Sequence, residues 1–202
     1  MLDGLRVLEV TSNAAVAPGS DPTRAASADV VVQTEDRLGY DRLATANPRT
    51  ILVTITPYGT TGPLAGVPAS DLEVTAASGC LWLAGEPGRT PVRTTLPQSP
   101  YWTGMYAALG ALAALAARER SGRGQHVDVS AQAAMATVHP PAIVFWETLR
   151  EEHRRLGPYL IGRSVVGATF RNIWPCADGY LAFAIQGGPI GRHTGRMLAD
   201  WM

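Results

Sequence analysis

Short apolar segments alternate with helical patterns over the first 145 residues of the chain. Three segments rich in β-branched residues predict buried strands: residues 5–10 (LRVLEV), 29–32 (DVVV) and 50–56 (TILVTIT). Residues 36–46 carry leucines at helical spacing and precede Asn47-Pro48, where a helix is expected to end. The intervening residues 11–28, which are rich in Ala, Ser, Pro and Gly, predict a loop.

The rest of the chain predicts helices separated by loops rich in glycine and proline. Ser70 or Asp71 is the expected N-cap of a helix over 71–84, which lies between loops at 57–70 and 86–100. A long helix of small apolar residues is predicted over 102–120, with basic residues in its last turn and a glycine just beyond it. The elements expected after it are a strand over 125–130, a helix from Ala131, and two strands within 170–185 that are joined at Asp178-Gly179.

The order of these elements predicts an α/β fold, in which a parallel Rossmann-like sheet is flanked by helices and is followed by the start of a smaller domain. We place the large domain at residues 1–160 and the beginning of the small domain at 161–202. The tail from about Ser164 has a more antiparallel pattern, and little apolar sequence follows Ile185. We therefore expect the small domain to be truncated.

Composition and charge restrict the functions that this fold could serve. The chain is 46% hydrophobic and 17% charged, and 17 basic residues balance 17 acidic ones. Such a chain has no overall field to attract nucleic acid or an anionic membrane, so an anionic ligand would be held locally. Cys80 and Cys176 lack the spacing of a metal site, and unpaired cysteines without a signal peptide predict a cytoplasmic location. The longest apolar stretch, 101–117, is shorter than the roughly 20 residues of a membrane span.

Residues 107–130 (AALGALAALAARERSGRGQHVDVS) resemble the signature of class III CoA-transferases, the group of formyl-CoA transferase, carnitine CoA-transferase and α-methylacyl-CoA racemase. Four other segments match in order: LDGLRVLEV from Leu2, NPRTILVTITPYGTTGP from Asn47, ASDLEVTAASGCLWLAGEPGRTPVR from Ala69 and PCADGYLAFA from Pro175. The resemblance implies a protein that handles acyl-CoA, with coenzyme A as the substrate moiety and no metal. Family dimers are interlocked, so the resemblance also implies a homodimer or a heteromer with an active paralogue.

The glycine-punctuated loop after the strand at 50–56 is the expected ligand site, because α/β folds bind ligands beyond the carboxyl ends of their strands. Glycines let backbone amides approach an anion or a thioester closely. In the family this region lies beside the CoA moiety. The resemblance therefore implies contacts with coenzyme A from Tyr58, Gly59, Thr61 and Gly62, and an ordinary surface loop is the alternative.

Ser70 and Asp71 occupy positions that lie near the acyl-thioester in family members. Racemases of the group have a histidine at the position of Ser70, and serine cannot exchange an α-proton. Asp71 could contact the substrate, or it could cap a helix.

The family's transferases carry a nucleophilic aspartate four residues before the glycine that opens the long helical run, which is Gly104 here. Its carboxylate attacks the acyl-CoA carbonyl and forms a mixed anhydride, which needs an ionisable oxygen. Pro100 takes that place, and no Asp or Glu lies between Arg89 and Arg118. The neighbouring Ser99 has no base beside it in sequence. His126 or His139 could supply one in space, although single histidines are more often structural.

The segment after the first strand is a second departure from the family. Family members continue there with a helix, a strand and a basic segment that help to hold the CoA nucleotide, whereas residues 16–28 lead almost directly to ADVVV here. Three hypotheses remain open. The chain is a transferase subunit that needs an active partner, a non-catalytic subunit, or a truncated inactive relative.

Overall fold

The computed structural model describes residues 4–10, 25, 27–35, 38–161, 169–184 and 188–201. The chain divides into two compact units: residues 1–81 with 93–150, and residues 82–92 with 151–202. The predicted loop at 11–28 lies almost wholly outside the described residues. The domain boundary placed after residue 160 stays a prediction.

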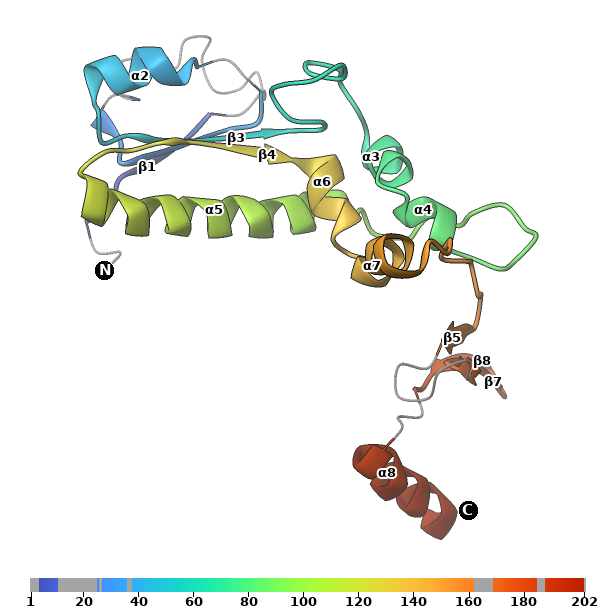
Figure 1. Ribbon diagram of the computed structural model, residues 1–202. Coiled ribbons are helices and arrows are strands. Elements are labelled where there is room, and N and C mark those ends of the chain that lie inside the picture. The colour runs from blue at the N-terminus through green and yellow to red at the C-terminus, as the bar shows by residue number, and fades with distance from the viewer. Residues whose placement is uncertain are drawn as a thin grey trace. The chain divides into compact units, whose positions relative to one another are not determined.

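A four-stranded parallel sheet forms the centre of the first unit (Figure 1). Its strands, in spatial order, are β1 (Val7–Val10), β2 (Val30–Gln33), β3 (Ile51–Thr56) and β4 (His126–Ser130). Val30 pairs with Ile51 of the next strand, and Leu52 pairs with His126. The predicted parallel α/β sheet is confirmed, and each strand lies within one or two residues of its predicted position.

The alternation of side chains along β3 explains why helices cover both faces of the sheet. Ile51 and Val53 point to one face, where they pack in a cluster with Ala107 and Ala114 of α5 (Ser99–Ser121). Leu52 points to the other face and packs in a cluster with Leu43 of α2 (Tyr40–Ala46). The two helices therefore lie on opposite sides of the sheet (Figure 1).

Helix α5 is longer than predicted and packs closely on β4. It begins at Ser99 rather than 102, because Pro100 suits the first turn of a helix, where its missing N–H has no intrahelical partner to lose. Near its middle, a Cβ added at Gly110 would lie 2.6 Å from Cγ1 of Val127. The small residues of this helix therefore allow the close packing that the sequence predicts.

A buried arginine near the end of α5 ties the helix to the starts of two strands. The guanidinium Nη1 of Arg118 donates to Oδ1 of Asp29 at 3.3 Å and to the carbonyl oxygen of Arg49 at 3.1 Å. The residue is only 4% exposed. Arg118 therefore holds the C-terminal end of α5 against the segments that lead into β2 and β3.

The turn from α5 into β4 leaves no room for a side chain at Gly124. The amide of Gly124 donates to the carbonyl oxygen of Pro48 at 2.8 Å. A Cβ added there would lie 1.9 Å from the carbonyl oxygen of Thr50, which is backbone and has no freedom to rotate away. The second glycine of the GRG sequence at 122–124 is therefore required by the close packing of this turn.

The helices predicted at 71–84 and from Ala131 are each divided in two. Gly79, at φ +82°, separates α3 (Asp71–Ala77) from α4 (Cys80–Leu83), because few residues other than glycine adopt that conformation. Similarly, residues 137–139 separate α6 (Ala131–Ala136) from α7 (Pro140–Leu149). Val74, Cys80 and Met135 join α3, α4 and α6 in one small core.

The second unit contains short antiparallel pairs. The predicted hairpin is confirmed as β7 (Ile173–Cys176) and β8 (Gly179–Ala182), with Ala177 and Asp178 in its turn. A further pair, β5 (Tyr159–Ile161) with β6 (Thr169–Arg171), was not predicted. The first predicted strand of the hairpin is thereby divided between β6 and β7. Helix α8 (Gly188–Trp201) follows and was not predicted either.

Candidate functional site

The loop after β3 is anchored at the carboxyl ends of the parallel strands. The amide of Gly59 donates to Oγ1 of Thr56 at 2.9 Å, and the amide of Gln132 donates to the carbonyl oxygen of Pro57 at 2.9 Å. Gly59 is buried and has φ +92°, a conformation that favours glycine. The first residues of this loop are therefore fixed by the strand end and by the first turn of α6.

The four residues predicted to contact coenzyme A differ in their exposure. Tyr58 is half-buried and Gly59 is buried, whereas Thr61 and Gly62 are exposed. Within the described part of the chain, the amides of Thr61 and Gly62 donate to no other residue. The amides of Thr61 and Gly62 are thus open to a ligand or to water.

Pro100 lies at the N-terminal end of α5, in an exposed part of its first turn. The position at which the sequence predicts the family's nucleophile is therefore a helix start. Backbone amides at a helix start favour a negative charge. A proline side chain offers neither charge nor an attacking atom, so this site as it stands cannot form an acyl intermediate at Pro100.

The Asp71 carboxylate binds the two residues that precede Pro100. Its Oδ1 accepts from the amides of Gln98 and Ser99 and from the hydroxyl of Ser99, each at 2.9 Å. Its Oδ2 forms an ion pair with Nε of Arg93 at 3.4 Å. Asp71 therefore caps α5, although it is itself the first residue of α3.

These contacts keep the Asp71 carboxyl ionised to a lower pH than usual. Burial acts to raise the pKa of its carboxyl, but the hydrogen bonds from Ser99 and Gln98 and the charge of Arg93 lower that pKa below its ordinary value. A carboxylate with a lowered pKa is a weak base and is held in place on both oxygens. Asp71 therefore organises the start of α5, and its predicted contact with the substrate stays a prediction.

Replacing Asp71 with alanine is expected to lower the free energy of unfolding by about 2 kcal/mol at pH 7, because three hydrogen bonds to an ionised cap are lost. Since the folded-state pKa is lowered, the stabilising contribution is complete above the ordinary pKa of 3.8 and disappears as the pH falls through the folded-state value. Urea unfolding of both proteins at pH 7 and pH 3 checks this. A difference that persists unchanged at the lower pH would contradict the assignment.

Ser70 has a local structural role. Its hydroxyl accepts from the amide of Glu73, and its own amide donates to Oε2 of Glu73 at 2.6 Å, which together form a capping box. The hydrogen bonds from the Ser70 backbone and side chain lower the pKa of the Glu73 carboxyl. Ser70 is thus the N-cap of α3, one of the two positions that the sequence offered for it.

Ser99 and His126 bind different partners and do not form a nucleophile and base pair. The hydroxyl of Ser99 donates to Asp71, and Ser99 is only 5% exposed. Nε2 of His126 shares a hydrogen bond with Oγ1 of Thr54 at 2.8 Å, and its ring stacks on Tyr40. His126 therefore belongs to the face of the sheet that α2 covers.

The predicted residues thus form two groups, one around Gly59 and the loop, the other around Asp71 and the start of α5. No hydrogen bond or ion pair joins the two groups among the residues that the structure describes. Sequence reasoning did not identify Arg93 or Asp128, which contact one group each. Their partners are distant in sequence, so no local spacing pointed to them.

Two further features limit the chemistry of the described residues. Within them, no three side chains of His, Cys, Asp or Glu come together as a metal ion would require. Over the same residues, every helix is too short or too polar to cross a bilayer.

Residues 25–200 match the sequence profile of CoA-transferase family III. The chain is 43% identical over 151 residues to the succinyl-CoA:(R)-benzylsuccinate CoA-transferase subunit BbsE of Thauera aromatica, covering 74% of this chain and 35% of that protein. It is 38% identical over 122 residues to the succinyl-CoA–L-malate CoA-transferase beta subunit of Chloroflexus aurantiacus, covering 57% of this chain and 30% of that protein. The chain therefore spans about a third of the length of these relatives.

A solved structure has a similar fold. The CAIB/BAIF family protein from Brucella suis superposes with a TM-score of 0.71 at 25% identity, covering 88% of this chain and 48% of that one. The chain thus shares its fold with a known protein.

Proposed function

Because the chain belongs to CoA-transferase family III, we propose that it takes part in the transfer of coenzyme A between an acyl-CoA thioester and a carboxylic acid. The names of two relatives specify succinyl-CoA as the donor, with (R)-benzylsuccinate or L-malate as the acceptor. We infer that this chain serves the same class of reaction, with a dicarboxylic acyl group. A cytoplasmic location is part of the proposal.

Pro100, at the predicted nucleophile position, is the basis for the more specific part of the proposal, which concerns a partner chain. Pro100 stands in the first turn of α5, and the Asp71 carboxylate beside that turn already binds two amides, a hydroxyl and Arg93. Neither group is free to attack a thioester carbon. We infer that the attacking carboxylate comes from a partner chain, so that this chain acts as one subunit of a heteromer.

Two observations support this assignment of roles. Both relatives named above are described as subunits, which means that each works with another chain. In addition, the loop at Tyr58, Gly59, Thr61 and Gly62 keeps its anchored geometry and open amides. We propose that this loop contacts coenzyme A, while the partner provides the nucleophile.

The proposal is tested by producing the full chain alone and together with a family III relative that carries aspartate at the position of Pro100. We expect transfer of CoA from succinyl-CoA to a dicarboxylate only in the complex, with at least about a thousandfold less turnover by the chain alone. Equal turnover by the isolated chain would contradict the need for a partner. A partner that is equally active without this chain would contradict its role as a subunit.

Replacing Pro100 with aspartate restores a carboxylate at the helix start, where the helix dipole favours it and folding is expected to be preserved. Succinyl-CoA should then form an acyl adduct on the variant that hydroxylamine removes, as seen by intact mass. Pro97→Asp is the matched control, since Pro97 lies just before the helix and should give no adduct. Absence of an adduct on a Pro100→Asp variant that still binds CoA would show that this helix start is not the transfer site.

A further inference from the structure

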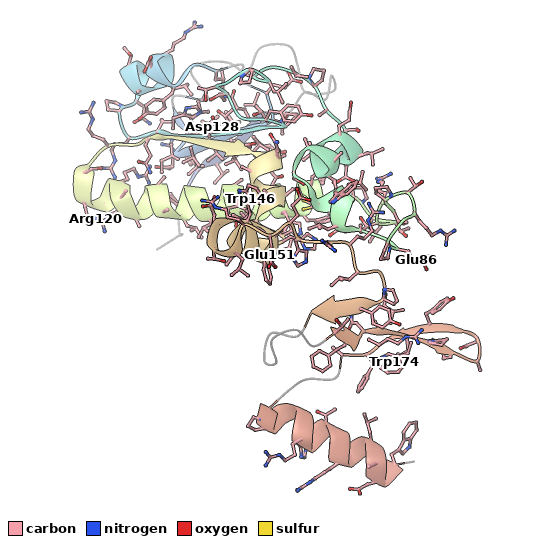
Figure 2. All side chains as sticks on the ribbon, turned by 45° about the vertical axis from the view of Figure 1, so that its right-hand side comes forward. Glu86, Arg120, Asp128, Trp146, Glu151 and Trp174 are labelled. Atoms are coloured by element: carbon pink, nitrogen blue, oxygen red, sulfur yellow. The ribbon has the colours of Figure 1, made fainter. Side chains whose placement is uncertain are left out.

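Asp128 of β4 connects this strand to the loop that follows β3 (Figure 2). Its Oδ2 accepts from the amide of Thr60 at 2.9 Å and from the hydroxyl of Thr60 at 2.6 Å. The two residues are 68 positions apart in the sequence. A carboxylate that binds both donors of one residue fixes that residue more firmly than a single neutral hydrogen bond would.

This contact lies immediately before the exposed part of the loop. Thr56 and Gln132 fix the loop up to Gly59, and Asp128 fixes the next residue, Thr60. The two exposed amides of Thr61 and Gly62 follow immediately. Asp128 is therefore the last anchor before the segment that is open to a ligand.

The surroundings of Asp128 argue against a purely structural role. Asp128 is exposed and Thr60 is half-buried, so the contact closes no core. Contacts between exposed surface groups usually change global stability little. Asp128 is also not tightly packed against the loop, since a Cβ added to Gly59 would lie 3.6 Å from its Oδ2, which is an ordinary contact distance. The charged contact thus orders a surface loop rather than the fold.

We propose that Asp128 is a positioning residue of the CoA-binding loop, and that it orients the amides of Thr61 and Gly62 toward an anionic or thioester group of coenzyme A. The inference rests on the proposed function of this loop. Asp128 itself does not touch the ligand, since a carboxylate would repel its phosphates. Its effect on the ligand passes through Thr60 to the two amides.

The test measures two quantities on the full chain: the dissociation constant for coenzyme A by calorimetry, and amide hydrogen exchange of residues 57–63. Asp128→Ala is expected to weaken CoA binding about tenfold and to speed exchange at Thr60, because both hydrogen bonds are lost. Asp128→Asn keeps an acceptor oxygen and should restore most of the affinity. Asp178→Ala, in the exposed turn of the β7–β8 hairpin, is the matched control and should change neither quantity.

The outcomes separate this inference from the proposed function. Weakened binding with a melting temperature close to that of the wild type, together with rescue by asparagine, supports the positioning role. Unchanged affinity in Asp128→Ala, or unchanged exchange at Thr60, overturns it even when the wild-type chain binds CoA. Absence of CoA binding by the wild type instead overturns the proposed role of the loop, and the inference with it.

Discussion

Replacing Gly124 with alanine is expected to lower the free energy of unfolding by at least about 3 kcal/mol and to reduce the yield of soluble protein. The added Cβ would lie 1.9 Å from the carbonyl oxygen of Thr50 and 2.7 Å from the carbonyl carbon of Arg49. Both atoms are backbone, so relief requires a shift of the segment that enters β3. That strand is the most buried of the sheet, and its displacement would disturb both of the cores that it joins.

Gly104→Ala is the control for this prediction. Gly104 lies inside α5 with nothing within 4 Å of an added Cβ, so alanine there should stabilise the helix by about 0.5–1 kcal/mol. Urea unfolding of the two variants beside the wild type gives both values. A Gly124→Ala protein as stable as the wild type would show that the backbone of the turn can shift at little cost, and would contradict the prediction.

Replacing Arg118 with alanine is expected to cost about 3 kcal/mol, which is the low end of the range for breaking a buried ion pair. The Asp29 carboxylate would lose its buried partner and, among the described residues, keep only Arg6, whose Nε lies 3.8 Å from Oδ2, and the carbonyl oxygen of Arg49 would lose a donor. The cost stays at the low end because the Asp29 side chain is 28% exposed and keeps some contact with water. The empty volume beside α5 adds to the loss.

Two variants refine the Arg118 prediction. The buried Nε of Arg118 has no hydrogen-bond partner among the described residues, so its pairing is incomplete. Arg118→Met, which keeps apolar volume, should therefore cost less than half as much as Arg118→Ala. Arg120→Ala, on the exposed side of the same turn, should stay within about 0.5 kcal/mol of the wild type. A loss below about 1 kcal/mol in Arg118→Ala, measured by urea unfolding, would refute a structural role for the pair.

The strands and the long helix could be predicted because their signals are local. The run TILVTIT contains its own β-branched pattern, and residues 102–120 form a long run of small apolar residues, although the helix start at Ser99 was placed three residues too late. The end of α3 before Gly79 was missed, because a glycine inside a helical pattern can either weaken a continuous helix or end it. Strand β5 was missed because a three-residue strand has too little pattern to recognise, and the break between β6 and β7 was missed for the same reason.

The contacts of the candidate site depended on distant partners and could not be predicted in the same way. Asp71 begins one helix and caps another that starts 28 residues later. The sequence predicted a capping role for Asp71 but could not indicate which helix it caps. Thr60 lies beside Asp128 only because β3 and β4 are neighbours in the sheet. The alternation of HVDVS places Asp128 on the polar side of its strand, which is the one local signal that could have drawn attention to it.

The start of α5 has a consequence for how such a chain could evolve. Proline suits the first turn of a helix, and Asp71 caps that turn from outside it, so the fold does not depend on a carboxylate at position 100. An exchange of aspartate for proline at this position is therefore expected to be close to neutral for folding. A duplicated gene could lose its chemistry here without passing through an unstable protein, and selection could then retain the copy for assembly alone.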